Sequence, residues 1–202
     1  LFFSCSEFER KTEKELAQEK FGDTPLVEYK PSPNPDKNAY FGDLHVHTEN
    51  SFDAYAFGTT ASPADAYKYA KGGAIKHPTG YQVQLSRPLD FYAVTDHGVF
   101  LGLMKEAADP NSEIGKYELT KPLHNLNENV SNSIISIIRR ANLFRPFAQE
   151  LANNIQDGTV DIKLLEKVSS DVWHKTIEAA DQAYVPGSFT TFAAYEYSSS
   201  VE

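Results

Sequence analysis

Three apolar segments of the chain each end in side chains that can bind a metal ion. The segments and the candidate ligands at their ends are residues 38–47 with His45 and His47, residues 89–95 followed by Asp96 and His97, and residues 189–197 with Glu196. The near-continuous apolar character of residues 89–95 is typical of a buried parallel strand. Helical segments separate the three strands, and such alternation predicts parallel strands joined by helical crossovers. We therefore predict an α/β fold in which the three groups meet at the carboxyl ends of the strands, where α/β barrels place their active sites.

The helices between these strands have recognisable boundaries. Ser62 is a predicted N-cap, Pro63 suits the first helical position, and the helix is expected to run to Lys71 before Gly72-Gly73. A long helical region follows the second strand, and Asp157-Gly158 is expected to divide it into two helices. The expected apolar faces consist of Val130, Ile134, Ile137, Ile138 and Ala141 in the first helix, and Leu165, Val168, Val172, Trp173, Ile177 and Ala180 in the second.

The His-x-His pair is the clearest chemical feature of the chain. Side chains at alternate positions of an extended segment point to one side, so His45 and His47 can bind one divalent cation as neutral imidazoles. Asp53 follows His47 by six residues and can return from a loop to supply an oxygen ligand. The alternative is that the histidines are hydrogen-bonded structural residues of the core or of a loop.

Two further acidic residues belong to the predicted site. Glu196 lies in an otherwise apolar strand between two tyrosines, where an unpaired charge would be costly, so a metal ion or a cationic side chain is expected beside it. Asp96 can orient a ligating histidine, or it can cap a following helix.

Arg87 can bind an anionic substrate group, or it can be a surface residue. His77, His124 and His174 are expected not to be ligands.

The net charge of the chain and the absence of several catalytic motifs from its sequence reduce the number of possible functions. The formal net charge of −9 argues against general nucleic-acid binding, whereas a phosphorylated small-molecule substrate remains compatible because bound cations reverse the local field. The sequence has no Gly-rich phosphate loop, nucleophile elbow or His-Glu-x-x-His motif. Metal-activated water is therefore the predicted nucleophile, with zinc, manganese or iron as candidate metals.

The N-terminal residues suggest an envelope protein. Residues 1–5 resemble the end of a lipoprotein signal with Cys5 as the lipidated residue, and polar residues 6–37 suit a linker before a domain at 38–202. We expect a periplasmic or outer-membrane lipoprotein of a bacterial cell envelope, attached to the membrane through a lipid on Cys5. The Leu at position 1 and the end of the chain soon after a strand predict a fragment of a longer protein.

Several motifs resemble those of a known superfamily. His45-Val46-His47, Asp53, Thr95-Asp96-His97 and Glu196 are similar to the first motifs of the PHP (polymerase and histidinol phosphatase) superfamily. Residues 42–48, 53–58, 85–91, 94–97 and 189–196 resemble more narrowly the bacterial domain-of-unknown-function 3604 family. The resemblance implies the N-terminal part of a distorted (β/α)7 barrel that binds up to three metals. It also implies that His45, His47, Asp53, His97 and Glu196 are ligands, with Glu196 bridging.

The sequence thus predicts a metal-dependent hydrolase that acts on phosphoesters with metal-activated water. One alternative is hydrolysis of another ester, an amide or a lactone. Another is a lipid-anchored protein that binds metal without turnover. A third is that this piece is inactive without residues beyond its C-terminus.

Overall fold

The computed structural model describes residues 34–128, 130 and 133–198. The chain divides into two units, Leu1–Asn38 and Ala39–Glu202, and the helices and strands lie in the second unit. Cys5 and most of the predicted linker lie outside the described residues. None of the described helices is long and apolar enough to cross a membrane.

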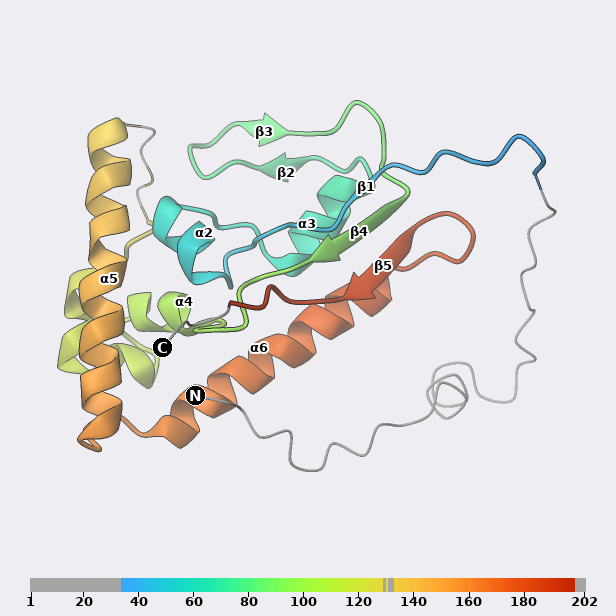
Figure 1. Ribbon diagram of the computed structural model, residues 1–202. Helices are drawn as coiled ribbons and strands as arrows, with labels where there is room; N and C mark the ends of the chain where they lie inside the picture. The colour runs from blue at the N-terminus through green and yellow to red at the C-terminus, as the bar shows by residue number, and fades with distance from the viewer. Residues whose placement is uncertain (1–33, 129, 131–132, 199–202) are drawn as a thin grey trace. The chain divides into compact units, whose positions relative to one another are not determined.

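A parallel sheet forms the centre of the second unit. Its strands are β1 (Gly42–Asp43), β4 (Phe91–Val94) and β5 (Thr190–Ala193), in the order β1-β4-β5 (Figure 1). Phe91 of β4 lies opposite Gly42 on one side and Thr190 on the other, and both pairings are parallel. The predicted α/β class is therefore confirmed. The described strands form this open sheet and a separate antiparallel pair, β2 (Ile75–Lys76) and β3 (Gln82–Val83), and not a closed barrel.

The three predicted strands are shorter than expected, with two, four and four residues. Side chains take over part of the hydrogen bonding between the segment after β1 and β4 at the carboxyl end of the sheet. The His45 N–H donates to the Asp43 carboxylate and the Val46 N–H donates to the Thr95 hydroxyl, each at 2.9 Å. The prediction that His45 and His47 end a strand is thus wrong in detail, because they lie in the loop after β1.

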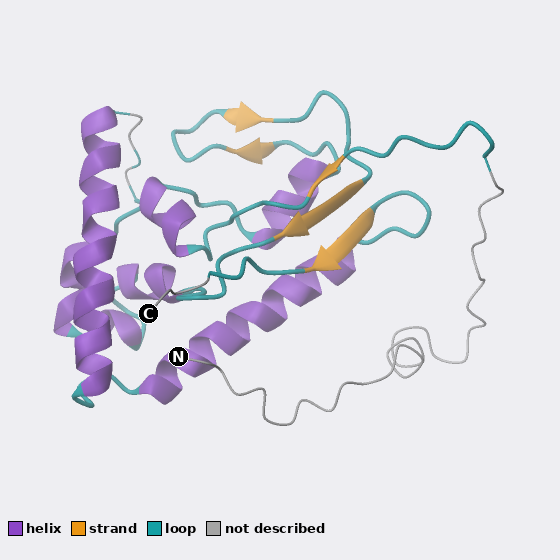
Figure 2. Ribbon diagram, viewed as in Figure 1, coloured by secondary structure: helices purple, strands orange, loops and turns teal. Residues whose placement is uncertain are grey.

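Two helices cover one face of the sheet (Figure 2). Helix α3 (Pro63–Ala70) begins after the predicted N-cap Ser62, which also forms a capping box with Asp65 that was not predicted. The helix packs against α6 (Ile162–Ala183). The core between these helices and the sheet contains Ala66, Tyr67, Ala70, Tyr92, Val94, Ala179, Ala180, Ala183 and Phe189. On the other face Phe192 is 46% exposed.

A second core lies beside the carboxyl end of the sheet. It is built from α2 (Phe52–Phe57), α4 (Leu103–Ala108), the 3-10 helices η1 (Ile114–Lys116) and η2 (Glu118–Leu123), and α5 (Ile134–Gln156). Helices α5 and α6 are separated at Asp157-Gly158, as predicted. The short helices α2 and α4 were not predicted, because six residues contain too few turns to show a helical period.

The predicted apolar face of α5 is partly wrong. Ile138, expected to be packed, is 56% exposed, whereas Arg140 is only 5% exposed. The Arg140 guanidinium donates to the carbonyl oxygens of Ala56, in the last turn of α2, and of Leu126, which follows η2. These hydrogen bonds offset the cost of burying a cation, a tertiary effect that helical periodicity does not reveal.

Candidate metal centre

The five predicted ligands come together at one end of the sheet. His45 and His47 follow β1, His97 follows β4 and Glu196 follows β5, where His97 and Glu196 form an isolated parallel bridge. The parallel arrangement explains this convergence, since equivalent ends of parallel strands share one edge of a sheet. Asp53 arrives from the first turn of α2, rather than from the loop that the sequence suggested.

An outer triplet consists of His45, His47 and Glu196. Glu196 Oε2 lies 3.0 Å from His45 Nε2 and 2.7 Å from His47 Nε2. Ligand–metal distances of about 2.1 Å place two adjacent ligand atoms about 3 Å apart, so these three atoms are spaced to share one ion. The His45 side chain is 72% exposed, which leaves this triplet open to solvent.

An inner triplet consists of His47, Asp53 and His97. Both carboxylate oxygens of Asp53 lie 3.1 Å from His47 Nδ1, and Asp53 Oδ2 lies 3.6 Å from His97 Nε2. The His47 and His97 side chains are only 16% and 15% exposed. The described part of the chain therefore contains two groups that could hold a metal ion, and they share His47.

The surroundings of His47 are the strongest evidence that this site can bind a cation. Its Nδ1 faces Asp53 and its Nε2 faces Glu196, so both ring nitrogens meet carboxylate oxygens at hydrogen-bonding distance. A neutral imidazole has only one N–H, and its other nitrogen presents a lone pair to the second carboxylate. Either a proton or a metal ion must relieve that repulsion, and a set of three imidazoles and two carboxylates suits a transition metal.

The two carboxylates of the site favour their ionised forms. Burial tends to raise the pKa of Asp53, but hydrogen bonds from Ser51, the Ala54 N–H and His47 outweigh it and leave the pKa below its usual value. The pKa of Glu196 is also below its usual value. Desolvation tends to raise it, but the hydrogen bond with His47 and the neighbouring histidines lower it by more. Ionised carboxylates are the form that binds a cation.

Asp96 lies beneath the loop that carries the histidines. Its side chain is almost wholly buried and accepts hydrogen bonds from the Thr48 N–H at 2.5 Å and the Thr48 hydroxyl at 2.7 Å. Burial raises the pKa of Asp96 despite these hydrogen bonds. Its contacts tie the end of β4 to the residue after His47, so Asp96 acts on the site by fixing a loop.

Arg87 is not brought to the cluster. Its guanidinium lies 5.3 Å from the centre of the Phe41 ring, and Phe41 immediately precedes β1. That position is at the amino end of the sheet, whereas the candidate ligands follow the carboxyl ends. The contact is a cation–π interaction at an exposed site. The geometry thus offers no support for substrate binding by Arg87.

The other three described histidines have local partners. His77 stacks on Tyr81 with ring centres 4.3 Å apart. The Nε2 of His124 lies 2.9 Å from the Gly115 carbonyl oxygen. His174 Nδ1 lies 2.7 Å from the carbonyl oxygen of Ser170, one turn earlier in α6.

Ser51 is a site residue that sequence reasoning missed. Its buried hydroxyl donates to Asp53 Oδ1 at 2.5 Å and accepts from the His97 N–H at 3.3 Å. The same oxygen lies 3.3 Å from His47 Nδ1, so one hydroxyl contacts three candidate ligands. Its place two residues before Asp53 was the available signal, because a serine before an acidic helical residue suggests a cap.

Comparison with known proteins supports one assignment. No curated protein and no solved structure matches the chain. The family described as "Protein of unknown function (DUF3604)" matches residues 34–202, which include the sheet and all five candidate ligands. The chain therefore belongs to the DUF3604 family.

Proposed function

We propose that this chain supplies the metal centre of a hydrolase that acts on phosphoesters. The observation that carries the proposal is the environment of His47, whose two ring nitrogens face two different carboxylates. A bound divalent cation lowers the pKa of water and stabilises negative charge on phosphoryl oxygens. The site thus has the components for hydrolysis without a protein nucleophile.

The residues of the chain have distinct parts in this proposal. The outer triplet is the open side of the site, because the His45 side chain is largely exposed, so the substrate approaches there. Asp53 and Glu196 hold the imidazoles in place and balance the positive charge of a cation. Asp96 keeps the histidine loop at the end of β4 through Thr48. Fixed ligand geometry of this kind is the main contribution of a protein to metal catalysis.

The sheet is compatible with part of a PHP-type barrel, which we propose as the complete fold. Thr191 donates a hydrogen bond to the Ala180 carbonyl oxygen of α6, so its neighbour Phe192 points to the opposite face. Helices α3 and α6 pack on the first face, whereas Phe192 is exposed on the opposite face. Parallel sheets occur almost only with both faces covered. In a barrel the helices lie outside and this face meets the side chains of further strands.

Elemental analysis and a hydrolysis screen test the proposed function together. We expect the full-length protein to contain zinc, manganese or iron and to hydrolyse phosphomonoesters or phosphodiesters. His45→Ala/His47→Ala should lose both the metal and the activity, whereas His174→Ala should keep both, because His174 bonds only within α6. Carboxylic ester, lactone and amide substrates form a parallel panel. Equal and low metal content in the wild type and the double variant would contradict a metal centre.

We further propose that the protein is a lipoprotein of the bacterial cell envelope, anchored through Cys5. The support is the sequence Leu1-Phe2-Phe3-Ser4-Cys5. Metabolic labelling with a radioactive fatty acid should mark the full-length protein and not Cys5→Ser. Equal labelling of the two proteins would exclude this anchor.

A further inference from the structure

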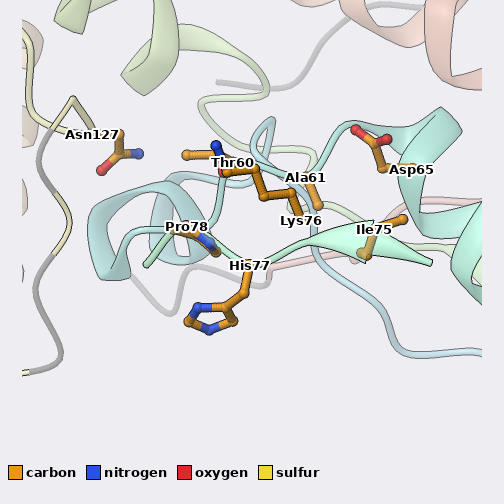
Figure 3. Close-up of a pocket in the computed structure, with 8 residues that line it drawn as sticks. All are labelled: Thr60, Ala61, Asp65, Ile75, Lys76, His77, Pro78 and Asn127. Carbon is orange, nitrogen blue, oxygen red and sulfur yellow. The ribbon is translucent and has the colours of Figure 1, made fainter. Parts of the chain in front are cut away.

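A separate cavity lies beside the hairpin of β2 (Ile75–Lys76) and β3 (Gln82–Val83). Its volume is about 250 Å³, and Lys76, His77, Thr60, Asp65 and Asn127 are among the residues that line it (Figure 3). None of the candidate metal ligands lines this cavity. The cavity is smaller than typical pockets for drug-sized ligands, which measure about 300–1,000 Å³, so its occupant must be small.

The acceptor groups of the cavity are already engaged. The Asp65 carboxylate accepts hydrogen bonds from the N–H and the hydroxyl of Ser62 in the capping box of α3. The Asn127 amide donates to the Tyr55 carbonyl oxygen, and its own oxygen accepts from Arg140. Asp65 is thus held through Oδ2 at the N-terminus of α3, where the helix dipole offsets part of its charge, and both ends of the Asn127 amide have partners.

Two hydrogen-bond donors in the lining of the cavity have no partner among the described residues. Within the described part of the chain, Lys76 has no ion pair and the Thr60 hydroxyl has no hydrogen bond. Figure 3 shows Lys76 beside Thr60, with the His77 ring directed away from Asp65 at the rim. The Thr79 N–H donates to His77 Nδ1, so a neutral His77 carries its proton on Nε2. An ammonium, a hydroxyl and an imidazole N–H together suit an anion with several oxygens.

We propose that this cavity binds a small tetrahedral oxyanion, either free phosphate or sulfate or the same group on a small metabolite. Lys76 supplies the charge and Thr60 a hydrogen bond within the cavity, and His77 meets the outer part of the ligand. The loop that contributes Thr60 is fixed, because the Ala61 carbonyl oxygen accepts from the Glu49 N–H at 2.9 Å and the Thr59 N–H donates to Ala54. The donors are therefore presented on a fixed backbone.

Titration of the isotope-labelled full-length protein with inorganic phosphate, sulfate and acetate tests this site by NMR. We expect saturable shifts of the backbone amide signals of residues 60–61 and 75–77 with phosphate or sulfate. These signals separate the cavity from the metal centre, whose loop comprises residues 45–48. The test is thus independent of the proposed hydrolase function. Saturation by acetate alone, or no saturable shift at these amides, would overturn the proposal.

Two variants assign the binding to particular side chains. Lys76→Gln should weaken phosphate binding about tenfold, because it removes a charge-assisted hydrogen bond. Thr60→Val should weaken it less, by a few-fold. Lys163→Gln is the matched control, since it removes the same charge from an exposed position on α6. Equal weakening by Lys76→Gln and Lys163→Gln would indicate a general charge effect and would exclude a built site. Equal binding of phosphate and sulfate would support a free oxyanion as the ligand. Tighter binding of a phosphorylated metabolite would support the same group on a larger molecule.

Discussion

The outer and inner triplets share His47 but differ in their support. The outer triplet depends on His45, whose side chain is 72% exposed and follows a strand of only two residues. In the inner triplet, the His97 ring stacks on Phe52 with ring centres 4.6 Å apart, and Phe52 stacks on Phe144 at 4.3 Å. Ser51 adds hydrogen bonds to Asp53 and to the His97 backbone. One triplet is thus held by packing, and the other lies open.

This difference suggests different tasks for the ions that the two triplets could hold. Ligands that are already immobilised lose little conformational entropy when they bind a metal, so the inner triplet should hold its ion more tightly. An exposed ligand loses more freedom, but it leaves room for water and substrate beside the ion. We therefore expect the inner ion to be retained and the outer ion to exchange. Substitutions in the two triplets test this contrast.

The largest effect is expected from His47→Ala. Because His47 belongs to both triplets, its loss should remove nearly all bound metal and all metal-dependent activity. Metal content after gel filtration, with His124→Gln as a control outside the cluster, provides the measurement. A variant that retains a full complement of metal would show that His47 is not a ligand.

The next effect separates the triplets. His45→Ala should lose only the outer ion, about half of the bound metal, and Asp53→Asn should lose mainly the inner ion. Timed dialysis against a chelator should show that the ion left in His45→Ala dissociates slowly. The ion left in Asp53→Asn should dissociate fast. The reverse order of release would refute the assignment of the tighter site to the inner triplet.

A smaller effect is expected from Ser51→Ala. Substitution of groups that orient metal ligands typically costs about 10–100-fold in affinity. Ser51 contacts Asp53 and His97, which belong to the inner triplet only, and it meets His47 at Nδ1, the nitrogen that faces Asp53. Affinity for the slowly released ion should fall by that factor, while the other ion is unaffected. Competition with a fluorescent chelator measures both affinities, and Ser86→Ala, at an exposed position, is the control. Equal weakening of both ions would point to a general loss of structure.

The smallest effect is expected from Phe144→Leu. The substitution keeps an apolar side chain in the second core but removes the stacking partner of Phe52. An aromatic pair contributes about 1 kcal/mol beyond its buried area, so urea unfolding should show a loss of that size. Release of the slow ion should accelerate by a few-fold, because His97 gains mobility. Unchanged release with reduced stability would show that the aromatic stack supports the core and not the inner triplet.

The sequence predicted the chemistry of the site better than its geometry. His45, His47, Asp53, His97 and Glu196 could be chosen because imidazoles and carboxylates stand out at the ends of apolar segments. Their distribution over two triplets could not be predicted, since it depends on contacts such as that between His47 and Glu196, which are far apart in the chain. The role of Ser51 was hidden for the same reason, because its partner His97 lies on another strand end.

The fold shows a similar division. Local signals predicted α3 from its Ser-Pro cap and the break between α5 and α6 from Asp157-Gly158, and both features are present. The apolar segments predicted longer strands than the structure has. The regular ladder beside β1 ends where the Asp43 carboxylate accepts from the His45 N–H and the Thr95 hydroxyl accepts from the Val46 N–H. The burial of Arg140 likewise follows from carbonyl oxygens in other segments.

The α/β class, the parallel strands and the kinds of candidate ligand can thus be predicted from the chain alone, because they follow from local periodicity, capping and side-chain chemistry. The packing of Asp53 and His97 in the inner triplet and the exposure of His45 became visible only in three dimensions. The same is true of the contact by which Asp96 fixes a loop and of the place of Arg87 at the other end of the sheet. Exposure and partner choice depend on which distant segments pack together, and no local pattern in the chain records that information.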